Sequence, residues 1–512
     1  MLRVLLLILL FLLPLSLLFA QQADRASSTH QIDLIIRTNV GSETPFWLQH
    51  NRRDLISETS GVHAGLLAEG ERPLSGRINL QWGGEMYGSG DAAIRDRPLH
   101  QAYLSLQYRN WQLRGGLWAE TVGITDPDLS AGPSIWSQNA RPMPKIKIEL
   151  TDFTSVPFTD GWFQVMGGFS HGWFEGGRVV EDFYLHEKYA YAKIGKSGYP
   201  ELYAGLIHMG QWGGYDTRRF GQLPVGFRDF LRIFMGEEGG ESSPQTWQNN
   251  RFGNSLGSWQ AGIYLQRGQW EFLVNKETIF EDGSGLKLWS PEDGVQGINI
   301  RYHHGAEASG TYRAGSTGAT RTLLPAASST SRHLAVSGFT YEFWHTKSQS
   351  GPGRQNRPSD WEGDPLYDED GHRFGGRDNY FNHAVYRQGW SYYGRTIGVP
   401  FITHDIESGR MINNRMIGHH LGLMHQAGRW GVRALYSWTK NYGAYDFPNN
   451  TEGPFDEPLT QNYTMLSVYT DLDRLVDLPL TAALEAGLDW GEFKGRRTGV
   501  LLSLVYRLAG AG

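Results

Sequence analysis

Residues 480–490 read LTAALEAGLDW, and this stretch decides the fold class. Apolar side chains occupy every second position from Leu480 to Trp490, while Glu485 and Asp489 lie at positions between them. Successive side chains of a β-strand point to opposite faces, so the stretch predicts a strand with one apolar and one polar face. Two acids on the polar face indicate that this face meets water or other charged groups.

The same alternation recurs at 78–86, 430–439 and 500–507. A soluble β-sandwich alternates too, but here charge sits in the middle of the polar faces, as at Glu85 and Arg433, where a wide barrel would turn it toward its lumen. Tryptophan and tyrosine gather toward strand ends, and the last strand stops close to the C-terminus. We therefore predict an all-β fold, an antiparallel transmembrane outer-membrane β-barrel.

The length of the chain limits the number of strands. After removal of a leader, about 490 residues remain, and about 25 to 30 residues per strand and connection give roughly 18 strands, within about 16 to 20. In lipid an open sheet edge would leave backbone groups unpaired, so the sheet must close. No linker rich in proline, serine or charge divides the chain, so we expect residues 21–512 to form a single barrel domain.

The N-terminus has the pattern of a secretory signal peptide at 1–20. Arg3 precedes an apolar run that ends at Ala20, a small residue before a cut at Gln21; a cut after Ala23 is an alternative. An uncleaved anchor helix is the other interpretation of this run. Beyond Ala20 no apolar stretch approaches the roughly 18 residues that a membrane helix needs, so we expect an exported chain that crosses the outer membrane as strands.

Composition excludes several classes of function. The chain has 47 basic and 53 acidic side chains, a formal net charge of -6, which gives no reason to expect nucleic acid as a partner. It has no cysteine, so disulfide scaffolds, thiolate zinc sites and cysteine nucleophiles are excluded.

Two irregular stretches predict long loops. Residues 305–331 are rich in Gly, Ala, Ser and Thr, and residues 348–382 are polar with acids clustered at 360–370. Loops of this size lie on the external rim or fold inward as a plug. The acidic cluster is interpreted as a solvated loop, with bound calcium as the alternative.

Several short strings add a resemblance. They are PFWL at 45–48, GLIH at 205–208, QWGG at 211–214, RFGNSLGSW at 251–259, FEDGSG at 280–285, DG at 293–294, DNYFN at 378–382, GWSYYGR at 389–395, IGVPF at 397–401 and NNR at 413–415. In these strings and their order the chain resembles the capsule assembly Wzi family, outer-membrane barrels that retain capsular polysaccharide, in its Bacteroidetes-type branch. The resemblance implies a barrel of about 18 strands with a largely blocked lumen that acts as a lectin for surface polysaccharide and not as a pore, and our leading hypothesis is a non-enzymatic protein. The partners it implies are capsular or exported polysaccharide, outer-membrane lipid and the polysaccharide export machinery.

Polysaccharide recognition needs flat apolar rings that stack on sugars, and planar amide, carboxylate and guanidinium groups that bond adjacent hydroxyls. If the polymer is acidic, arginines would pair with its carboxylates. The candidate binding residues are Trp212, Arg218, Arg219, Trp247, Asn250, Arg251, Asn254, Trp259, Glu281 and Asp282. The alternative is that the tryptophans belong to interfacial girdles and the arginines pair with lumen carboxylates.

We predict no catalytic residue. Adjacent carboxylates such as Glu281 and Asp282 point to opposite faces of a strand and cannot flank one glycosidic bond. The string GNSLG at 253–257 matches a nucleophile elbow, but strand-forming residues follow it where the elbow needs a helix. A hydrolase would need Ser255 within reach of a histidine and a carboxylate. A porin or transporter with an open lumen and an outer-membrane hydrolase remain the two alternatives.

We predict no metal site and no cofactor. The histidine pairs at 303–304 and 419–420 are neighbours on strands, so the two members of each pair face opposite sides and cannot readily chelate one ion.

Overall fold

The structure, a computed structural model, describes residues 29–237, 252–281, 288, 290–304, 335–349, 378–405, 410–444 and 455–510. The predicted signal peptide at 1–20 and the predicted loop at 305–331 lie outside the described residues. Of the predicted loop at 348–382, only 348–349 and 378–382 are described.

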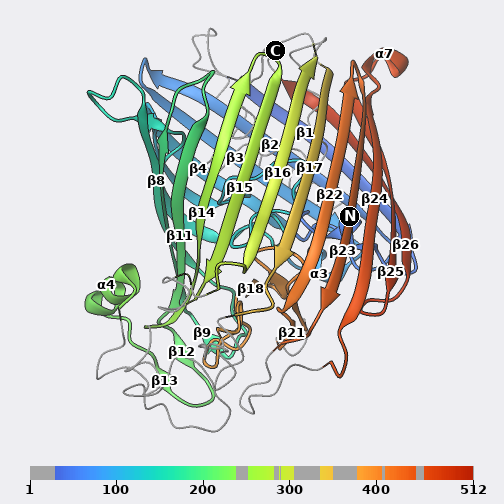
Figure 1. Cartoon of the computed structure of the whole chain (residues 1–512). Coiled ribbons are helices and arrows are strands. Elements are labelled where there is room, and N and C mark those ends of the chain that lie inside the picture. The colour runs from blue at the N-terminus through green and yellow to red at the C-terminus, as the bar shows by residue number, and fades with distance from the viewer. Residues whose placement is uncertain are drawn as a thin grey trace.

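Eighteen long strands form the wall of one barrel (Figure 1). Their bounds are β1 (Thr29–Gly41), β2 (Gly61–Ser75), β3 (Ile78–Ser89), β4 (Leu99–Tyr108), β5 (Trp111–Leu117), β6 (Pro144–Leu150), β8 (Phe163–Trp173), β10 (Tyr184–Ile194), β11 (Glu201–Trp212), β14 (Asn254–Arg267), β15 (Trp270–Phe280), β16 (Gly294–His304), β17 (Ala335–His345), β22 (Met416–Ala427), β23 (Trp430–Asn441), β24 (Leu459–Asp471), β25 (Leu480–Gly491) and β26 (Arg497–Gly510). The two-residue β7 (Thr154–Ser155) pairs with β8 next to β6.

Every strand pairs antiparallel with the next strand along the wall, and β1 closes the ring by pairing with β26. At this closing seam Ile36 lies opposite Leu504. The prediction of an antiparallel outer-membrane barrel of about 18 strands is confirmed. No helix in the described part of the chain is long and apolar enough to cross a membrane.

The alternation in β25 turns out as the sequence predicts. Leu484 is 55% exposed on the outer face, whereas its neighbours Ala483 and Glu485 are each 1% exposed and face the lumen. The outer leucines meet hydrocarbon at little cost, while inward carboxylates find partners inside. Trp111, Trp270 and Trp430 begin β5, β15 and β23 at one end of the barrel and are about half exposed, as interfacial aromatics are.

The two ends of the barrel differ. At one end, β2–β3, β4–β5, β14–β15 and β22–β23 are joined by only two residues each, and both β1 begins and β26 ends there. We call it the short-turn end; it lies at the top of Figure 1, although it also carries the connection 305–334. The opposite, long-loop end carries the connections 42–60, 118–143, 213–253 and 346–415.

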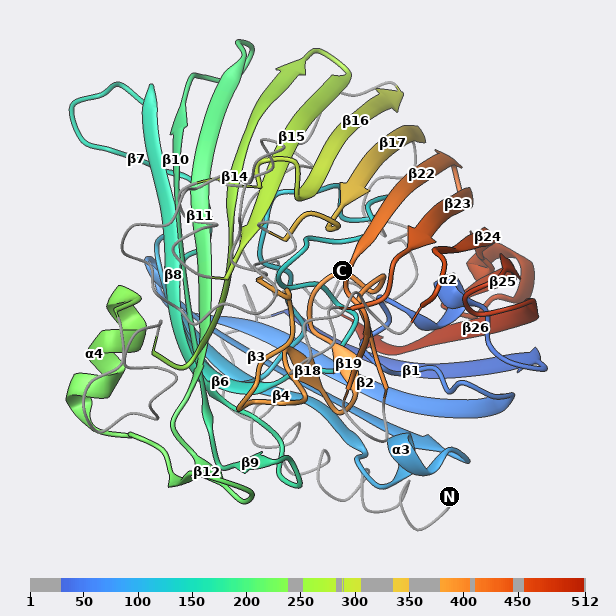
Figure 2. The same cartoon turned by 60° about the horizontal axis from the view of Figure 1, so that its bottom comes forward.

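Three of these long connections fold back into the barrel and fill it (Figure 2). We call residues 42–60, 118–143 and 378–405 the plug. They contain the short helix α2 (Phe46–Gln49) and the short strands β18 (Ser391–Tyr392), β19 (Arg395–Thr396) and β20 (Thr403–His404), of which β20 pairs with β21 (Met411–Asn413).

An apolar core joins the plug to the inner wall. Trp47, Leu129 and Trp390 come from the three plug segments and are 0–2% exposed. They belong to one cluster with Ile207 and Leu501 of the wall. Where the plug meets the wall, the described part of the lumen is therefore packed like a protein interior, as the expectation of an occluded barrel requires.

Buried ion pairs fasten the plug to the wall. Arg52 bonds Glu485 of β25 at 2.8 Å, and Arg53 bonds Glu85 of β3 at 2.6 Å. Glu120 bonds Lys147 of β6 at 2.9 Å. The mid-strand acids Glu85 and Glu485 thus face plug arginines, whereas Arg433 pairs with Glu485 of the wall at 3.4 Å and donates to the backbone carbonyl of Asp128.

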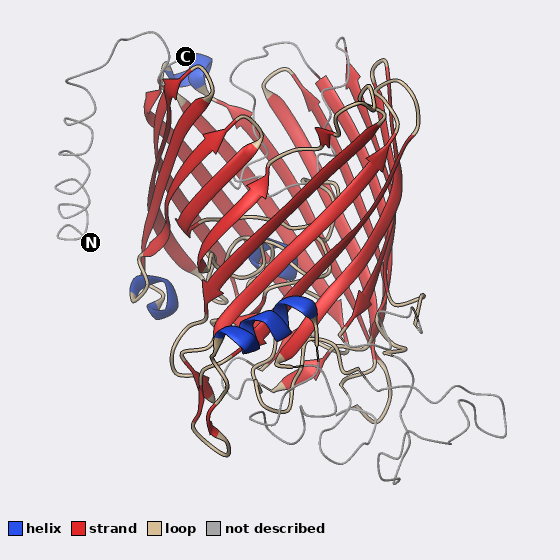
Figure 3. Ribbon diagram, turned by 90° about the vertical axis from the view of Figure 1, so that its left-hand side faces the viewer, coloured by secondary structure: helices blue, strands red, loops and turns tan. Residues whose placement is uncertain are grey.

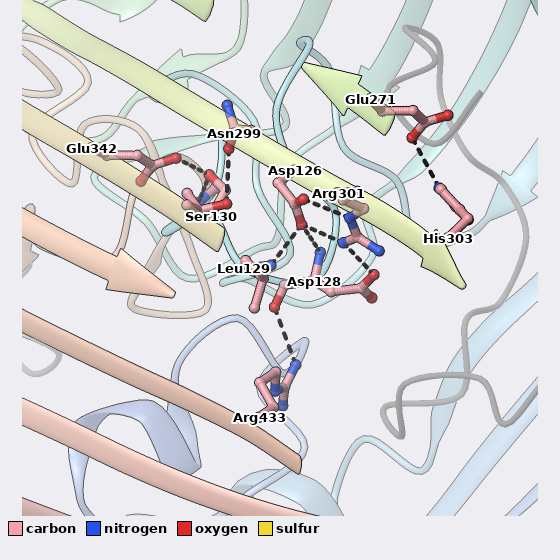
Figure 4. A network of polar contacts seen from close by, with 12 residues as sticks. Asp126, Asp128, Leu129, Ser130, Glu271, Asn299, Arg301, His303, Glu342 and Arg433 are labelled. Carbon is pink, nitrogen blue, oxygen red and sulfur yellow. Dashed lines mark hydrogen bonds and ion pairs between the residues drawn. The ribbon is translucent and has the colours of Figure 1, made fainter. Parts of the chain in front are cut away.

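The tip of the segment 118–143 is held most closely (Figure 4). Arg301 of β16 donates to both carboxylate oxygens of Asp126, at 2.8 and 2.6 Å, and to Asp128 at 2.7 Å. Asp126 also accepts the backbone N–H groups of Asp128 and Leu129, each at 2.9 Å, which shapes the turn. On β17, Glu342 accepts a hydrogen bond from Ser130.

Candidate functional site

A small sheet stands beyond the barrel wall at the long-loop end (Figure 1). It consists of β9 (Val180–Glu181), β12 (Tyr215–Asp216) and β13 (Gly221–Gln222). The carboxylate of Asp216 accepts the backbone N–H groups of Arg218 and Arg219, at 2.8 and 3.3 Å. Such a turn lets a short polar side chain replace missing backbone partners, so the sequence after Asp216 forms a compact tip.

This tip carries two of the candidate residues. Arg218 and Arg219 are both exposed, and the guanidinium of Arg219 lies 4.9 Å from the ring centroid of Phe220. Tyr215, which the sequence analysis did not select, is 51% exposed next to them. An exposed ring and two guanidinium groups therefore occupy five consecutive positions.

The connection 174–183 links the small sheet to the plug. Arg178 donates to the carbonyls of Ser391 at 2.8 Å and Gly389 at 2.9 Å, and it pairs with Glu175 at 2.8 Å. Glu175 in turn accepts the backbone N–H of Tyr393 at 3.0 Å. Because β9 belongs to the same connection, these bonds attach the small sheet to the plug hairpin.

The plug hairpin β18–β19 adds a second aromatic group to this surface. Tyr393 and Gly394 both have positive φ, 49° and 80°, as the two central residues of a tight hairpin turn require. The Tyr393 ring lies 4.0 Å from the guanidinium of the exposed Arg97 and 5.4 Å from that of Arg141. We call Arg97, Tyr215, Arg218, Arg219 and Tyr393 the long-loop face.

Charge near the hairpin is mostly compensated. Arg395 bonds Asp54 and Glu58, each at 3.2 Å. Burial raises the pKa of Asp54, an effect that Arg395 opposes. Burial likewise lowers the pKa of Arg141. The exposed cations of the face are thus Arg97, Arg218 and Arg219.

Two candidate residues have structural contacts instead. Trp212 is only 5% exposed, with its ring centroid 5.1 Å from that of Tyr184 and 5.9 Å from that of Phe230. Asn254 is 2% exposed and donates to Gln211 at 2.7 Å. Neither side chain can reach a polymer on the surface without a rearrangement of its neighbours.

The remaining candidates lie elsewhere. Trp259 is 38% exposed on the outer wall, the position of a membrane-facing aromatic. Glu281 accepts the backbone N–H of Phe381 at 2.8 Å and so holds the plug. Trp247, Asn250, Arg251 and Asp282 lie outside the described residues.

The string at 253–257 is part of a strand, not an elbow followed by a helix, because β14 begins at Asn254. Ser255 nevertheless lies near a base: its Oγ is 3.3 Å from Nε2 of His208 on the adjacent strand β11. A hydrolase would need both a histidine and a carboxylate near Ser255, and this contact supplies the histidine. Both residues are 7% exposed.

The histidine pairs behave as expected for strand neighbours. On β22, His420 faces the lumen and bonds the carbonyl of Leu129 at 2.7 Å, whereas His419 bonds Tyr341 on the outer face at 2.9 Å. Within the described ranges, no group of three or more His, Cys, Asp or Glu side chains is arranged to hold a metal ion.

Sequence reasoning missed Arg97, Tyr215 and Tyr393. The tyrosine–glycine pair at 393–394 was a usable signal, since glycine at such a position marks a tight turn that projects its neighbour. Nothing in the sequence pairs Arg97 with Tyr393, because 296 positions separate them and only the inward path of the plug brings them together.

No protein-family model matches the chain, and neither does any curated protein. Among solved structures, the chain is similar to one described as Wzi, an outer membrane protein involved in group 1 capsule assembly in Escherichia coli, a carbohydrate-binding β-barrel. That similarity has a TM-score of 0.52 at 13% identity and covers 93% of this chain and 84% of that one. OpdL of Pseudomonas aeruginosa matches with a TM-score of 0.43 at 8% identity, over 94% of this chain and 99% of that chain. At such identities the likeness concerns the fold alone.

Proposed function

We propose that this outer-membrane barrel binds capsular or exported polysaccharide on its long-loop face and tethers it to the cell surface. The observation that carries the proposal is the combination, at one end of the barrel, of the exposed Tyr215 ring, the half-buried Tyr393 ring and exposed guanidinium groups over a plugged lumen. A plugged barrel can hold a polymer at its mouth but offers it no open path.

The chemistry of the face suits an acidic glycan. Tyr215 offers a flat apolar ring for a sugar, and Arg218 and Arg219 stand beside it. Guanidinium groups bond carboxylates in pairs of parallel hydrogen bonds, which favours uronate or pyruvate substituents. The similar solved barrel is itself described as carbohydrate binding, which is consistent with this role.

The orientation follows from the loops. Outer-membrane barrels place short turns in the periplasm and longer loops outside the cell, so the long-loop face would be extracellular. The proposal also includes export through a cleaved signal peptide at 1–20 and contact with the polysaccharide export machinery. Mass spectrometry of the mature N-terminus tests the first of these, and crosslinking in cells tests the second.

The binding test uses surface polysaccharide purified from the native cell and the full chain in lipid nanodiscs. The double variant Arg218→Ala/Arg219→Ala removes two charge-assisted contacts, each worth about 1.5–3 kcal/mol, so binding should weaken about a hundredfold or more. The matched control, Arg77→Ala/Arg267→Ala, removes the same charge from exposed positions at the short-turn end and should bind like the wild type. Absence of binding by the folded wild type would overturn the role, whereas equal binding by all three proteins would move the site away from the tip.

The porin alternative requires an open path, and the packed plug argues against it. The hydrolase alternative is favoured by one observation, the 3.3 Å contact between Ser255 and His208. It predicts that a fluorophosphonate probe labels the wild type and not Ser255→Ala. Equal or absent labelling of both would remove it.

A further inference from the structure

A nine-residue helix, α4 (Phe227–Met235), lies against the outside of the barrel near the long-loop end (Figure 3). The helix has well-defined ends: Asp229 accepts the backbone N–H of Gly226 at 2.9 Å, and Gly236 closes the last turn with φ 69°. It belongs to the connection 213–253, the same connection that carries Arg218 and Arg219.

One face of α4 packs tightly on the wall. The Phe230 ring lies 5.9 Å from that of Trp212, and the Phe234 ring 5.4 Å from that of His186. Ile233 is fully buried over Gly210, where a Cβ would stand 2.5 Å from its side chain. Only glycine at this position lets the helix approach so closely.

The wall beneath α4 is unusually polar for an outer surface. On β10, Leu185 and Glu187 face the lumen. The alternate residues His186 and Lys188 therefore face outward. On the adjacent strand, His208 also faces outward. Bare in hydrocarbon, such groups would cost several kcal/mol each.

The helix covers this polar patch. His186 is 0% exposed, and neither of its ring nitrogens has a hydrogen-bond partner among the described residues. The ammonium of Lys188 lies 4.5 Å from the ring centroid of Phe234, which gives its charge a partner. The apolar residues of α4 therefore stand where the strands themselves lack an apolar outer face.

Beside the packed face, α4 carries a second apolar stripe that nothing in the described chain covers, while Arg228 and Arg232 point away from the wall. Phe227, Leu231 and Met235 recur at every fourth position and are 74, 42 and 65% exposed. Positions four apart lie on the same side of a helix. The outer wall of the same sector is also apolar: Ala190 and Ala204 are exposed between this helix and the short-turn end.

We propose that α4 lies within the lipid leaflet at the long-loop end, where Phe227, Leu231 and Met235 contact acyl chains. Lipid is the occupant that the geometry favours, because the helix lies on the outer wall of the barrel and the rest of that sector presents apolar side chains on its outer face. The helix then has two tasks: it seals a polar section of the wall from hydrocarbon, and it anchors the connection whose tip carries Arg218 and Arg219. The inference stands independently of the polysaccharide role.

The chain has no cysteine, so a single introduced cysteine can carry a spin label without background. Spin labels are placed at Phe227→Cys, Leu231→Cys and Met235→Cys, and each variant is reconstituted in nanodiscs. Power saturation then measures how accessible each label is to oxygen, which concentrates in lipid, and to a nickel chelate, which stays in water. Leu484→Cys on the outer wall is the lipid control, and Thr217→Cys at the exposed tip is the water control.

The proposal expects the ratio of oxygen to nickel accessibility on α4 to exceed that of Thr217→Cys several-fold and to approach that of Leu484→Cys. A ratio equal to that of Thr217→Cys would place the stripe in water and overturn the proposal. Low accessibility to both reagents would mean that protein covers the stripe, which overturns lipid as its occupant. Retained heat-modifiable migration in each variant confirms that the barrel has folded.

Discussion

Asp126 should be the most sensitive single anchor of the plug. Its carboxylate accepts four hydrogen bonds, two from Arg301 and two from the backbone of Asp128 and Leu129. The side chain of Asp126 is 0% exposed and that of Arg301 is 6% exposed. Asp126→Asn keeps the shape but removes the charge that faces the buried guanidinium.

Removal of one partner from a buried ion pair costs about 3–5 kcal/mol. Asp128, which lies 2.7 Å from the same guanidinium and is 14% exposed, keeps part of the compensation. We therefore expect the lower end, a loss of about 3 kcal/mol in the free energy of unfolding. Because the anchor holds the tip of 118–143 inside the lumen, its loss should also raise the ion conductance of the barrel.

The assay is equilibrium unfolding by denaturant in lipid vesicles, combined with a double-mutant cycle that pairs Asp126→Asn with Arg301→Gln. The matched control is Asp160→Asn. Asp160 forms an ion pair of similar length, 2.6 Å to Lys196, but its side chain is 93% exposed. The control should leave stability unchanged, since solvent screens such pairs. A loss for Asp126→Asn no larger than the control's, or a cycle additive within about 0.5 kcal/mol, would show that Asp126 does not anchor the plug through Arg301.

Three further outcomes are expected. The wild type should show almost no single-channel conductance in a planar bilayer, because the plug packs the lumen, and porin-like steps would contradict an occluded barrel. Gly389→Ala should destabilise the plug by more than the roughly 1–2 kcal/mol that a positive φ alone costs, because its Cβ would also lie 1.9 Å from the carbonyl oxygen of Phe381. The control is Gly177→Ala, which has a positive φ but open space around the new Cβ and so measures the cost of φ alone. Equal losses of stability for the two variants in denaturant unfolding would contradict the clash. Burial lowers the pKa of His404 to about 4 within the plug, so the folded chain holds this ring neutral while the unfolded chain protonates it near its usual pKa of 6.5. The contribution of neutral His404 to the free energy of unfolding should be complete above pH 6.5 and fall by about 3 kcal/mol as the pH drops to 4. The free energy of unfolding of His404→Gln should therefore depend less on pH across this range. The same pH dependence in His404→Gln and the wild type would contradict this expectation.

The wall of the barrel could be predicted because strand alternation is a local property. Residues 480–490 already separate Leu484 from Glu485, and the structure places the first outside and the second inside. The plug could not be traced in the same way. Its segments have no regular period, and their positions depend on partners such as Glu485 for Arg52, which lie 433 positions apart.

The candidate site could likewise be predicted only in part from the sequence. Trp212 and Arg218 are close in sequence, and proximity suggested a shared role. The strand ends at Trp212, which leaves its ring under α4, whereas Arg218 belongs to the turn that Asp216 organises outside the wall. A helix that packs on the outside of the barrel left no signal in the strand pattern.

We propose that polysaccharide binds at the long-loop end of a plugged barrel. The absence of cysteine permits a direct measurement: the rate at which a maleimide reacts with Thr217→Cys, next to Arg218, with and without saturating surface polysaccharide from the native cell. Arg267→Cys reports on the short-turn end in the same way. With polysaccharide bound, we expect the maleimide to react several-fold more slowly with Thr217→Cys and at an unchanged rate with Arg267→Cys. Unchanged rates at both positions, or protection at Arg267→Cys alone, would contradict it.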